Sequence, residues 1–104
     1  MSRKYFSWGA SGNVDGTGAA ITITLDFKPS RVELFNVTGN CQLVWIDDMA
    51  AGKGQKIVDS GTNLTDISYI ASGGVTVNSV GFQIGTDADL NVSAETIHWI
   101  AYRN

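Results

Sequence analysis

The chain has 104 residues, of which 43% are hydrophobic and only 16% are charged, and its formal net charge is −3. Its length predicts one domain, and its acidic balance argues against binding to nucleic acid, which needs a basic face. No apolar run approaches the roughly 20 residues that span a bilayer, so no membrane partner is expected.

Charged residues are scarcer here than the roughly 25% typical of soluble domains. Two explanations stay open. Either part of the surface is covered by other protein, or a surface rich in Ser, Thr and Asn keeps the chain in solution without charge.

Residues 1–18 are expected to form a partly irregular N-terminal arm, followed by a β domain over residues 19–104. The start, MSRKYFSWGASG, holds two basic residues but lacks the apolar core of a secretory signal. The chain is therefore expected to be made inside a cell and to stay there or be packaged from there. The arm is expected to order against a neighbouring subunit. Its candidate partner contacts combine positive charge with aromatic rings, which are favoured in interfaces: Arg3, Lys4, Tyr5, Phe6 and Trp8.

The rest of the chain reads as short strands. AAITITLDF alternates apolar and polar residues, the period-two pattern of a half-buried strand. RVELFNV and CQLVWID are separated by TGN, which suits a hairpin. DDMAAGKGQK is expected to be a loop with at most one helical turn, because it contains two glycines. ISYIA and VTVNSVGFQI lie on either side of SGG, which is expected to separate two strands.

The final strand, ETIHWIAYR, places Ile97, Trp99 and Ala101 on one face. Trp45 and Trp99 are expected to be buried, whereas Trp8 is the candidate contact residue. Together the pattern predicts an all-β, single-domain β-sandwich or jelly-roll-like barrel of about seven or eight short antiparallel strands.

None of the candidate catalytic or ligand-binding motifs in the sequence has all the residues, or the geometry, that its chemistry requires. AAGKGQK lacks the upstream glycine and the Ser or Thr of a phosphate-binding loop. Asp47 and Asp48 are neighbours and so would point to opposite faces of a strand, unlike the two carboxylates that flank a glycosidic bond. His98 is the only histidine and is expected to be a partly exposed strand residue. No G-x-S-x-G elbow is present, so we expect neither an enzyme nor a cofactor.

The stretch DADLN places Asp87, Asp89 and Asn91 at alternate positions, as at the start of an EF-hand loop. Val92 and His98 occupy the positions where that loop needs glycine and glutamate. We therefore expect no metal site, but a turn in which Asp and Asn side chains bond backbone amides.

Cys41 is the only cysteine, which rules out an intramolecular disulfide. It lies in the apolar run NCQLVWI, where a free cysteine usually behaves as a small buried hydrophobe. We expect an unreactive thiol.

The C-terminal stretch GFQIGTDADLNVSAETIHWIAYR resembles a pattern of small phage virion proteins and phage fibre modules. That pattern is GF-x-[IV]-G, a polar turn with Asn, and an aromatic strand ending in A-[FYW]-R. The upstream FKPSRV resembles the F-x-P-x-x-V strand entry of the same family. The matching residues are Gly81, Phe82, Ile84, Gly85, Asn91, Ala101, Tyr102 and Arg103, with Phe27, Pro29 and Val32 upstream.

The resemblance implies a non-enzymatic phage virion structural protein. The preferred role is a capsid decoration (cement) protein that binds the major capsid protein on the capsid surface and stabilises the shell. Such a protein would be made in the host cytoplasm and form a homotrimer or homodimer, with many weak lattice contacts acting together. The alternative is a carbohydrate- or receptor-binding β-sandwich module of a phage tail or fibre.

Overall fold

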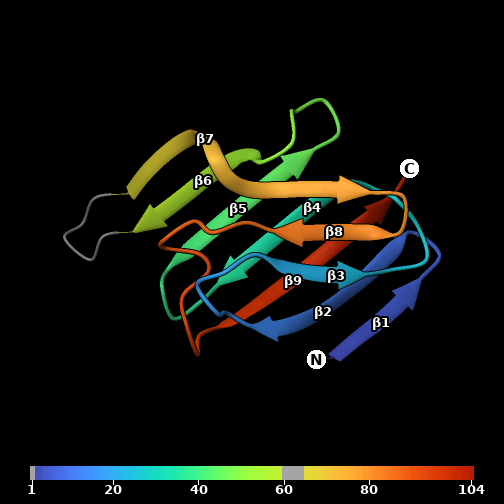
Figure 1. The fold of residues 1–104 in the computed structure, drawn as a ribbon, viewed down its shortest axis with the longest axis horizontal. Helices are drawn as coiled ribbons and strands as arrows, with labels where there is room; N and C mark the ends of the chain where they lie inside the picture. The colour runs from blue at the N-terminus through green and yellow to red at the C-terminus, as the bar shows by residue number, and fades with distance from the viewer. Residues whose placement is uncertain (1, 60–64) are drawn as a thin grey trace.

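The computed structural model describes residues 2–59 and 65–104, which form nine β-strands (Figure 1). These are β1 (Ser2–Phe6), β2 (Gly9–Asp15), β3 (Ile21–Thr24), β4 (Pro29–Asn36), β5 (Cys41–Ile46), β6 (Lys53–Asp59), β7 (Thr65–Asn78), β8 (Gly81–Ile84) and β9 (Thr96–Arg103). The expected all-β single domain is confirmed, with nine strands in place of seven or eight. Among residues 2–59 and 65–104, there is no helix that could span a membrane.

The strands form one antiparallel sheet in the order β1-β2-β9-β4-β5-β6-β7-β8-β3. This sheet makes two layers because it folds over along β7. The wide layer runs from β1 to the first half of β7, which pairs with β6. The small layer consists of the second half of β7 with β8 and β3. Figure 1 shows the small layer lying across the wide one.

The core lies between the layers and follows the period-two pattern of the strands. In β4, β5 and β9, buried side chains alternate with half-buried or exposed ones. Trp99 of the wide layer packs edge-on against Phe82 of the small layer, with ring centroids 5.5 Å apart. Burial of Trp45 and Trp99 is confirmed. The core comprises Ala10, Ile23, Leu25, Val32, Leu34, Cys41, Leu43, Trp45, Val75, Phe82, Ile84, Leu90, Ile97, Trp99 and Ala101.

The fold-over of β7 depends on glycine. The register with β6 shifts at this point, so that residues 71–74 bulge out of the ladder. Gly73 has a φ of 82°, a conformation that side chains rarely adopt. A Cβ on Gly74 would lie 2.1 Å from the carbonyl oxygen of Lys53, and one on Gly85 would lie 2.4 Å from the carbonyl carbon of Gly73. Only bare backbone allows the strands to approach this closely.

This bend corrects two expectations from the sequence. The SGG stretch does not separate two strands, because it lies inside β7 and turns that strand from one layer into the other. The loop expected over DDMAAGKGQK ends earlier, since β6 begins at Lys53 and pairs with both β5 and β7. Alternation is weak in β6, which is why the strand was missed.

The prediction of an irregular N-terminal arm is also wrong for the described residues. Residues 2–15 form the hairpin of β1 and β2, and β2 pairs with β9 along its whole length. Because β2 is rich in small residues, its sequence resembles that of a linker. The same small residues allow the β2 backbone to lie close to β9. A Cβ on Gly9 would lie 2.0 Å from the carbonyl oxygen of Ala101.

Two buried asparagines hold the long loops in place. The Asn91 side chain accepts hydrogen bonds from the backbone N–H groups of Thr17 and Gly18, and its amide donates to the carbonyls of Ala19 and Gly85. Three of these bonds join the β2–β3 loop to the β8–β9 loop, and the bond to Gly85 lies within the β8–β9 loop. Because every buried polar atom of this side chain has a partner, its burial carries little penalty.

The Asn36 amide donates to the Leu90 carbonyl and to the Glu95 carboxylate, and its oxygen accepts from the Gly39 N–H. Asn36 thereby ties the β4–β5 turn to the same β8–β9 loop. That loop crosses between the layers, because β8 belongs to the small layer and β9 to the wide one.

We expect Gly74→Ala to destabilise the protein by about 3 kcal/mol or more, because rigid backbone blocks the added methyl group. Gly18→Ala is the control. Its φ is 79° and nothing lies within 4 Å of the added Cβ, so only backbone strain of about 1 kcal/mol is expected. Urea unfolding measures both, and equal losses would contradict the role given to the β7 bend.

Candidate functional site

The surface of the wide layer that faces away from the small layer is called the outer face here. Its side chains alternate with the buried ones, and in a sheet with one solvated face they are usually polar. Here many are apolar, and Ile67 and Tyr69 are 61% and 57% exposed. Large exposed apolar patches often mark interaction sites, so this face is a candidate interaction surface. The apolar outward residues are Phe35, Val44, Ile46, Ile57, Ile67, Tyr69, Ile100 and Tyr102.

Three aromatic rings lie together at one end of this face. The rings of Phe6 and Trp8 stack with centroids 4.8 Å apart and planes 3° from parallel. The Trp8 ring also lies 5.4 Å from that of Tyr102. Trp8 and Phe6 are 46% and 39% exposed. We call Phe6, Trp8 and Tyr102 the aromatic cluster.

The backbone of β9 positions this cluster. The N–H of Arg103 donates to the Trp8 carbonyl over 2.8 Å, which fixes the β1–β2 turn against the end of β9. The Arg103 side chain lies over the ring of Phe27 at 4.3 Å and pairs with Asp26. The aromatic cluster is therefore held by strand pairing rather than by a free arm.

Charge beside the cluster is balanced. Arg31 and Glu33 form a salt bridge of 2.7 Å on β4, and the Arg31 guanidinium lies 6.0 Å from the centre of the Tyr102 ring. Burial and the neighbouring Glu33 carboxylate raise the pKa of Tyr102 above its ordinary value. Its phenol is neutral at physiological pH, and a hydrogen bond to Glu33 contributes to the raised pKa.

The structure separates the five contact residues expected from the sequence. Phe6 and Trp8 enter the aromatic cluster. Lys4 and Tyr5 are exposed on β1, but Tyr5 lies on the opposite side of the strand from Phe6. The Arg3 guanidinium donates to the carbonyl of Thr24 on β3, so Arg3 links the two edge strands of the sheet.

Sequence reasoning missed Tyr102 and Arg31 as members of this site. They join it because Tyr102 pairs with Gly9 on one side and with Arg31 on the other. The sequence carries no signal for that pairing, since the three residues come from distant segments. An outward aromatic residue near the end of the last strand was the only hint.

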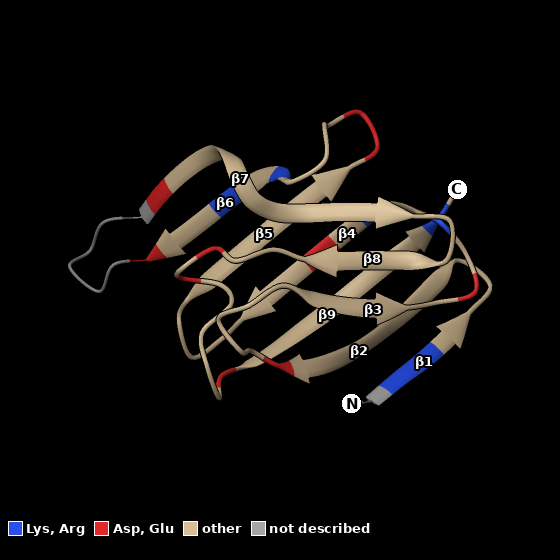
Figure 2. Ribbon diagram, viewed as in Figure 1, with Lys and Arg blue, Asp and Glu red and all other residues tan. Residues whose placement is uncertain are grey.

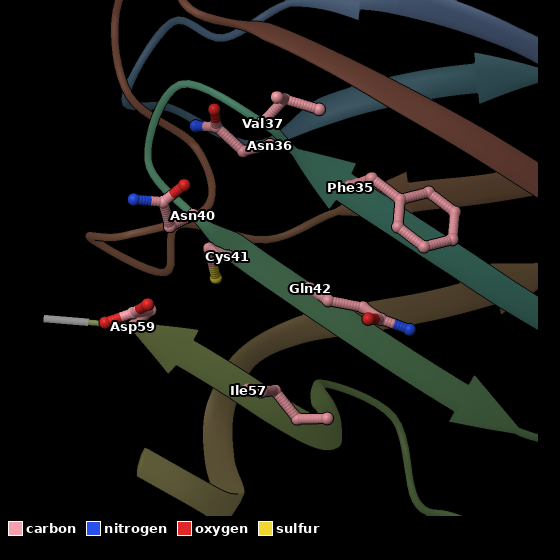
Figure 3. A pocket seen from close by; sticks show the side chains of 8 residues that line it. All are labelled: Phe35, Asn36, Val37, Asn40, Cys41, Gln42, Ile57 and Asp59. Carbon is pink, nitrogen blue, oxygen red and sulfur yellow. The ribbon is translucent and has the colours of Figure 1, made fainter. Parts of the chain in front are cut away.

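Two hollows open on the outer face, and Phe35 stands between them. One of about 360 Å³ lies between β4, β5 and β6 and is lined by Phe35, Val37, Gln42 and Ile57 among others (Figure 3). The other, of about 330 Å³, extends towards β1 and is lined by Lys4, Ser11, Phe35, His98 and Ile100 among others. Both hollows mix apolar and polar lining residues.

The acidic turn after β8 forms as the sequence predicts. One carboxylate oxygen of Asp87 accepts hydrogen bonds from the backbone N–H groups of Asp89 and Leu90. Its other oxygen accepts from the Lys56 ammonium at 3.0 Å, and Asp89 lies 2.6 Å from the same nitrogen. Burial lowers the pKa of Lys56, but the hydrogen bonds to Asp89 and Asp87 outweigh it and leave the pKa raised. This ion group ties the loop to β6.

The remaining candidates keep the structural roles expected of them. His98 is exposed on β9, and Asp47 and Asp48 lie in an exposed turn after β5. Figure 2 shows that most acidic residues lie in loops and at strand ends. Across residues 2–59 and 65–104, no group of three or more His, Cys, Asp or Glu residues is placed to hold a metal ion.

Comparison of the chain with protein-family models, with curated proteins and with solved structures finds no match.

Cys41 is buried in the core, as expected from its apolar run. Burial, with a smaller contribution from the Asp87 carboxylate, raises the pKa of its thiol to about 11. We expect a thiol reagent at pH 8 to label native protein at least a hundredfold more slowly than urea-unfolded protein, because the thiolate is the reactive form. Rapid labelling of the native chain would contradict the buried position, and the unfolded chain is the control for reagent activity.

Proposed function

We propose that this chain is a non-enzymatic structural protein of a phage virion, a decoration protein that binds the outside of the capsid through its aromatic cluster. The proposal rests on one observation above all. Phe6, Trp8 and Tyr102 form an exposed, rigidly supported group of rings beside the Arg31–Glu33 pair. Tryptophan, tyrosine and arginine are the residues that most often dominate protein interfaces.

The support beneath the cluster favours binding to a rigid surface. All three rings stand on paired backbone: Phe6 is in β1, Tyr102 in β9, and the Trp8 turn is bonded to β9. Such pre-organisation lowers the entropy cost of binding. Repeated on a capsid lattice, a modest contact of this kind stabilises the shell by the sum of many copies.

The scarcity of charge also supports a role in which protein covers part of the surface. Of the two explanations open at the level of the sequence, the apolar outer face favours burial against a partner. The aromatic cluster lies at the end of that face, next to charges that already neutralise each other. A partner surface would meet rings and a satisfied ion pair there, not an isolated charge that is costly to desolvate.

Co-sedimentation with shells assembled from the major capsid protein of the same phage tests the proposal. We expect saturable binding, and we expect Trp8→Ala to weaken it about tenfold or more. The matched control is Val80→Ala, which removes an exposed apolar side chain from the β7–β8 turn of the small layer, where Val80 is 53% exposed. Absence of binding by the unmodified chain would overturn the capsid role. Equal loss in both variants would remove the aromatic cluster from the contact.

A second candidate function is carbohydrate or receptor binding in a phage tail or fibre, favoured by the exposed ring of Trp8. Aromatic faces pack well against the apolar faces of sugars. Since Trp45 and Trp99 are 3% and 1% exposed, a change in tryptophan emission on adding a glycan would report Trp8. We expect a saturable change that Trp8→Phe abolishes if this function holds, and no change with any glycan of a broad panel if it does not.

A further inference from the structure

We propose that two copies of this chain pair edge to edge through residues 66–70 of β7, in an antiparallel ladder with a two-fold axis at Ser68. This contact would continue the sheet of one copy into the sheet of the other, and it does not depend on the proposed capsid contact. The occupant of the edge is a second copy. The argument comes from the free backbone of this segment, its exposed side chains and its charge.

The bend of β7 leaves the sheet with a third edge. β8 pairs only with residues 75–78 of β7, so on the side away from β6 no strand of residues 2–59 and 65–104 pairs with residues 66–70. Figure 1 shows this part of β7 as the outermost strand of the wide layer. Every second residue of such a strand directs its N–H and C=O away from the sheet, where another strand can pair with them. We call residues 66–70 the free edge.

The other two edges have features that oppose pairing, whereas the free edge lacks them. β1 carries Arg3 and Lys4, and β3 is only four residues long. Arg3 also donates to the Thr24 carbonyl and so joins these two strands. Charge, short length and cover are the usual protections of a sheet edge. The free edge contains no proline and no basic residue, and its single charge is Asp66, which favours a partner strand here.

The side chains of the free edge are complementary to their own copy. Ile67 and Tyr69 are 61% and 57% exposed and lie on the same side of the strand. A two-fold axis at Ser68 places Ile67 of each copy directly opposite Tyr69 of its partner. Aromatic and β-branched side chains in that position stabilise an antiparallel pair. No other antiparallel register forms this contact twice.

The charge of the segment also suits an antiparallel copy. Asp59 and Asp66 lie where β7 begins, and Lys53 lies where it bends. The remaining charged residue of β6, Lys56, is held in the ion group of the acidic turn. Since antiparallel pairing reverses one copy, the acidic end of each edge lies beside the Lys53 end of the other. Opposite charges therefore face each other across the contact, which favours this orientation.

The edge contact leaves the aromatic cluster accessible. Tyr102 is on β9, and β4, β5 and β6 lie between β9 and β7 in the sheet. Four inter-strand spacings amount to about 19 Å. The cluster and the free edge are thus at opposite sides of the wide layer. A dimer formed in this way would present two aromatic clusters to a further partner and gain from their joint binding.

Sedimentation velocity of the purified chain between about 10 μM and 1 mM tests the proposal without any capsid. We expect a species of twice the chain mass, in exchange with the single chain. Ile67→Lys should raise the dissociation constant at least about tenfold, because it places two ammonium groups diagonally across the ladder. Ile67 is largely exposed, so its replacement leaves the fold intact. Val80→Lys is the matched control, because it places the same charge at an exposed position of the small layer, and it should dimerise like the unmodified chain.

Amide hydrogen exchange on the same samples identifies the surface that pairs. At the highest concentration we expect the amides of residues 66–70 that face away from β6 to exchange at least about twofold more slowly than at the lowest, because the partner strand accepts their hydrogen bonds. The amides of β1 and β3 at the other two edges are the control and should exchange at an unchanged rate.

Three results would overturn the proposal. One is a single-chain mass throughout the concentration range. Another is a dimer in which the exchange of residues 66–70 does not depend on concentration, since another surface would then form the contact. The last is an unchanged dissociation constant in Ile67→Lys. Each can occur with or without capsid binding, so this test and that of the decoration role fail separately.

Discussion

The bend of β7 at Gly73 and Gly74 is the constraint on which the rest of the structure depends. A sheet with an apolar face must cover that face with another element, and the described residues contain no helix to do so. The sheet covers itself: β7 leaves β6, turns, and continues beside β8 in the second layer. Bare glycine backbone makes this possible, because a Cβ at Gly74 would meet the Lys53 carbonyl. Trp99 and Phe82 then meet across the layers.

Folding in this way covers one face of the wide layer and leaves the other to solvent. The loops that cross between layers are held by hydrogen bonds of Asn91 and Asn36 and by the ion group of Lys56, Asp87 and Asp89. These polar contacts lie in the loops, while the outer face mixes apolar side chains with polar ones such as Glu33, Gln42 and Gln55. The function proposed above assigns that face to contact with other protein.

The aromatic cluster offers exposed rings on rigid backbone. Its position is set by the register of β9 with its two neighbours, β2 and β4. A change in that register by one residue would turn the Tyr102 side chain into the core.

The amino-acid sequence by itself determined the all-β class, the inward face of the last strand, the burial of Trp45, Trp99 and Cys41, and the acidic turn at Asp87. Each follows from period-two alternation or from local side-chain bonding, which act over a few residues. Only the tertiary structure decided that residues 2–15 belong to the sheet, that SGG bends a strand instead of ending one, and that Tyr102 and Arg31 join Phe6 and Trp8. Those outcomes depend on contacts between segments far apart in the chain, and on close backbone approach at glycines, whose lack of a side chain leaves no pattern to read.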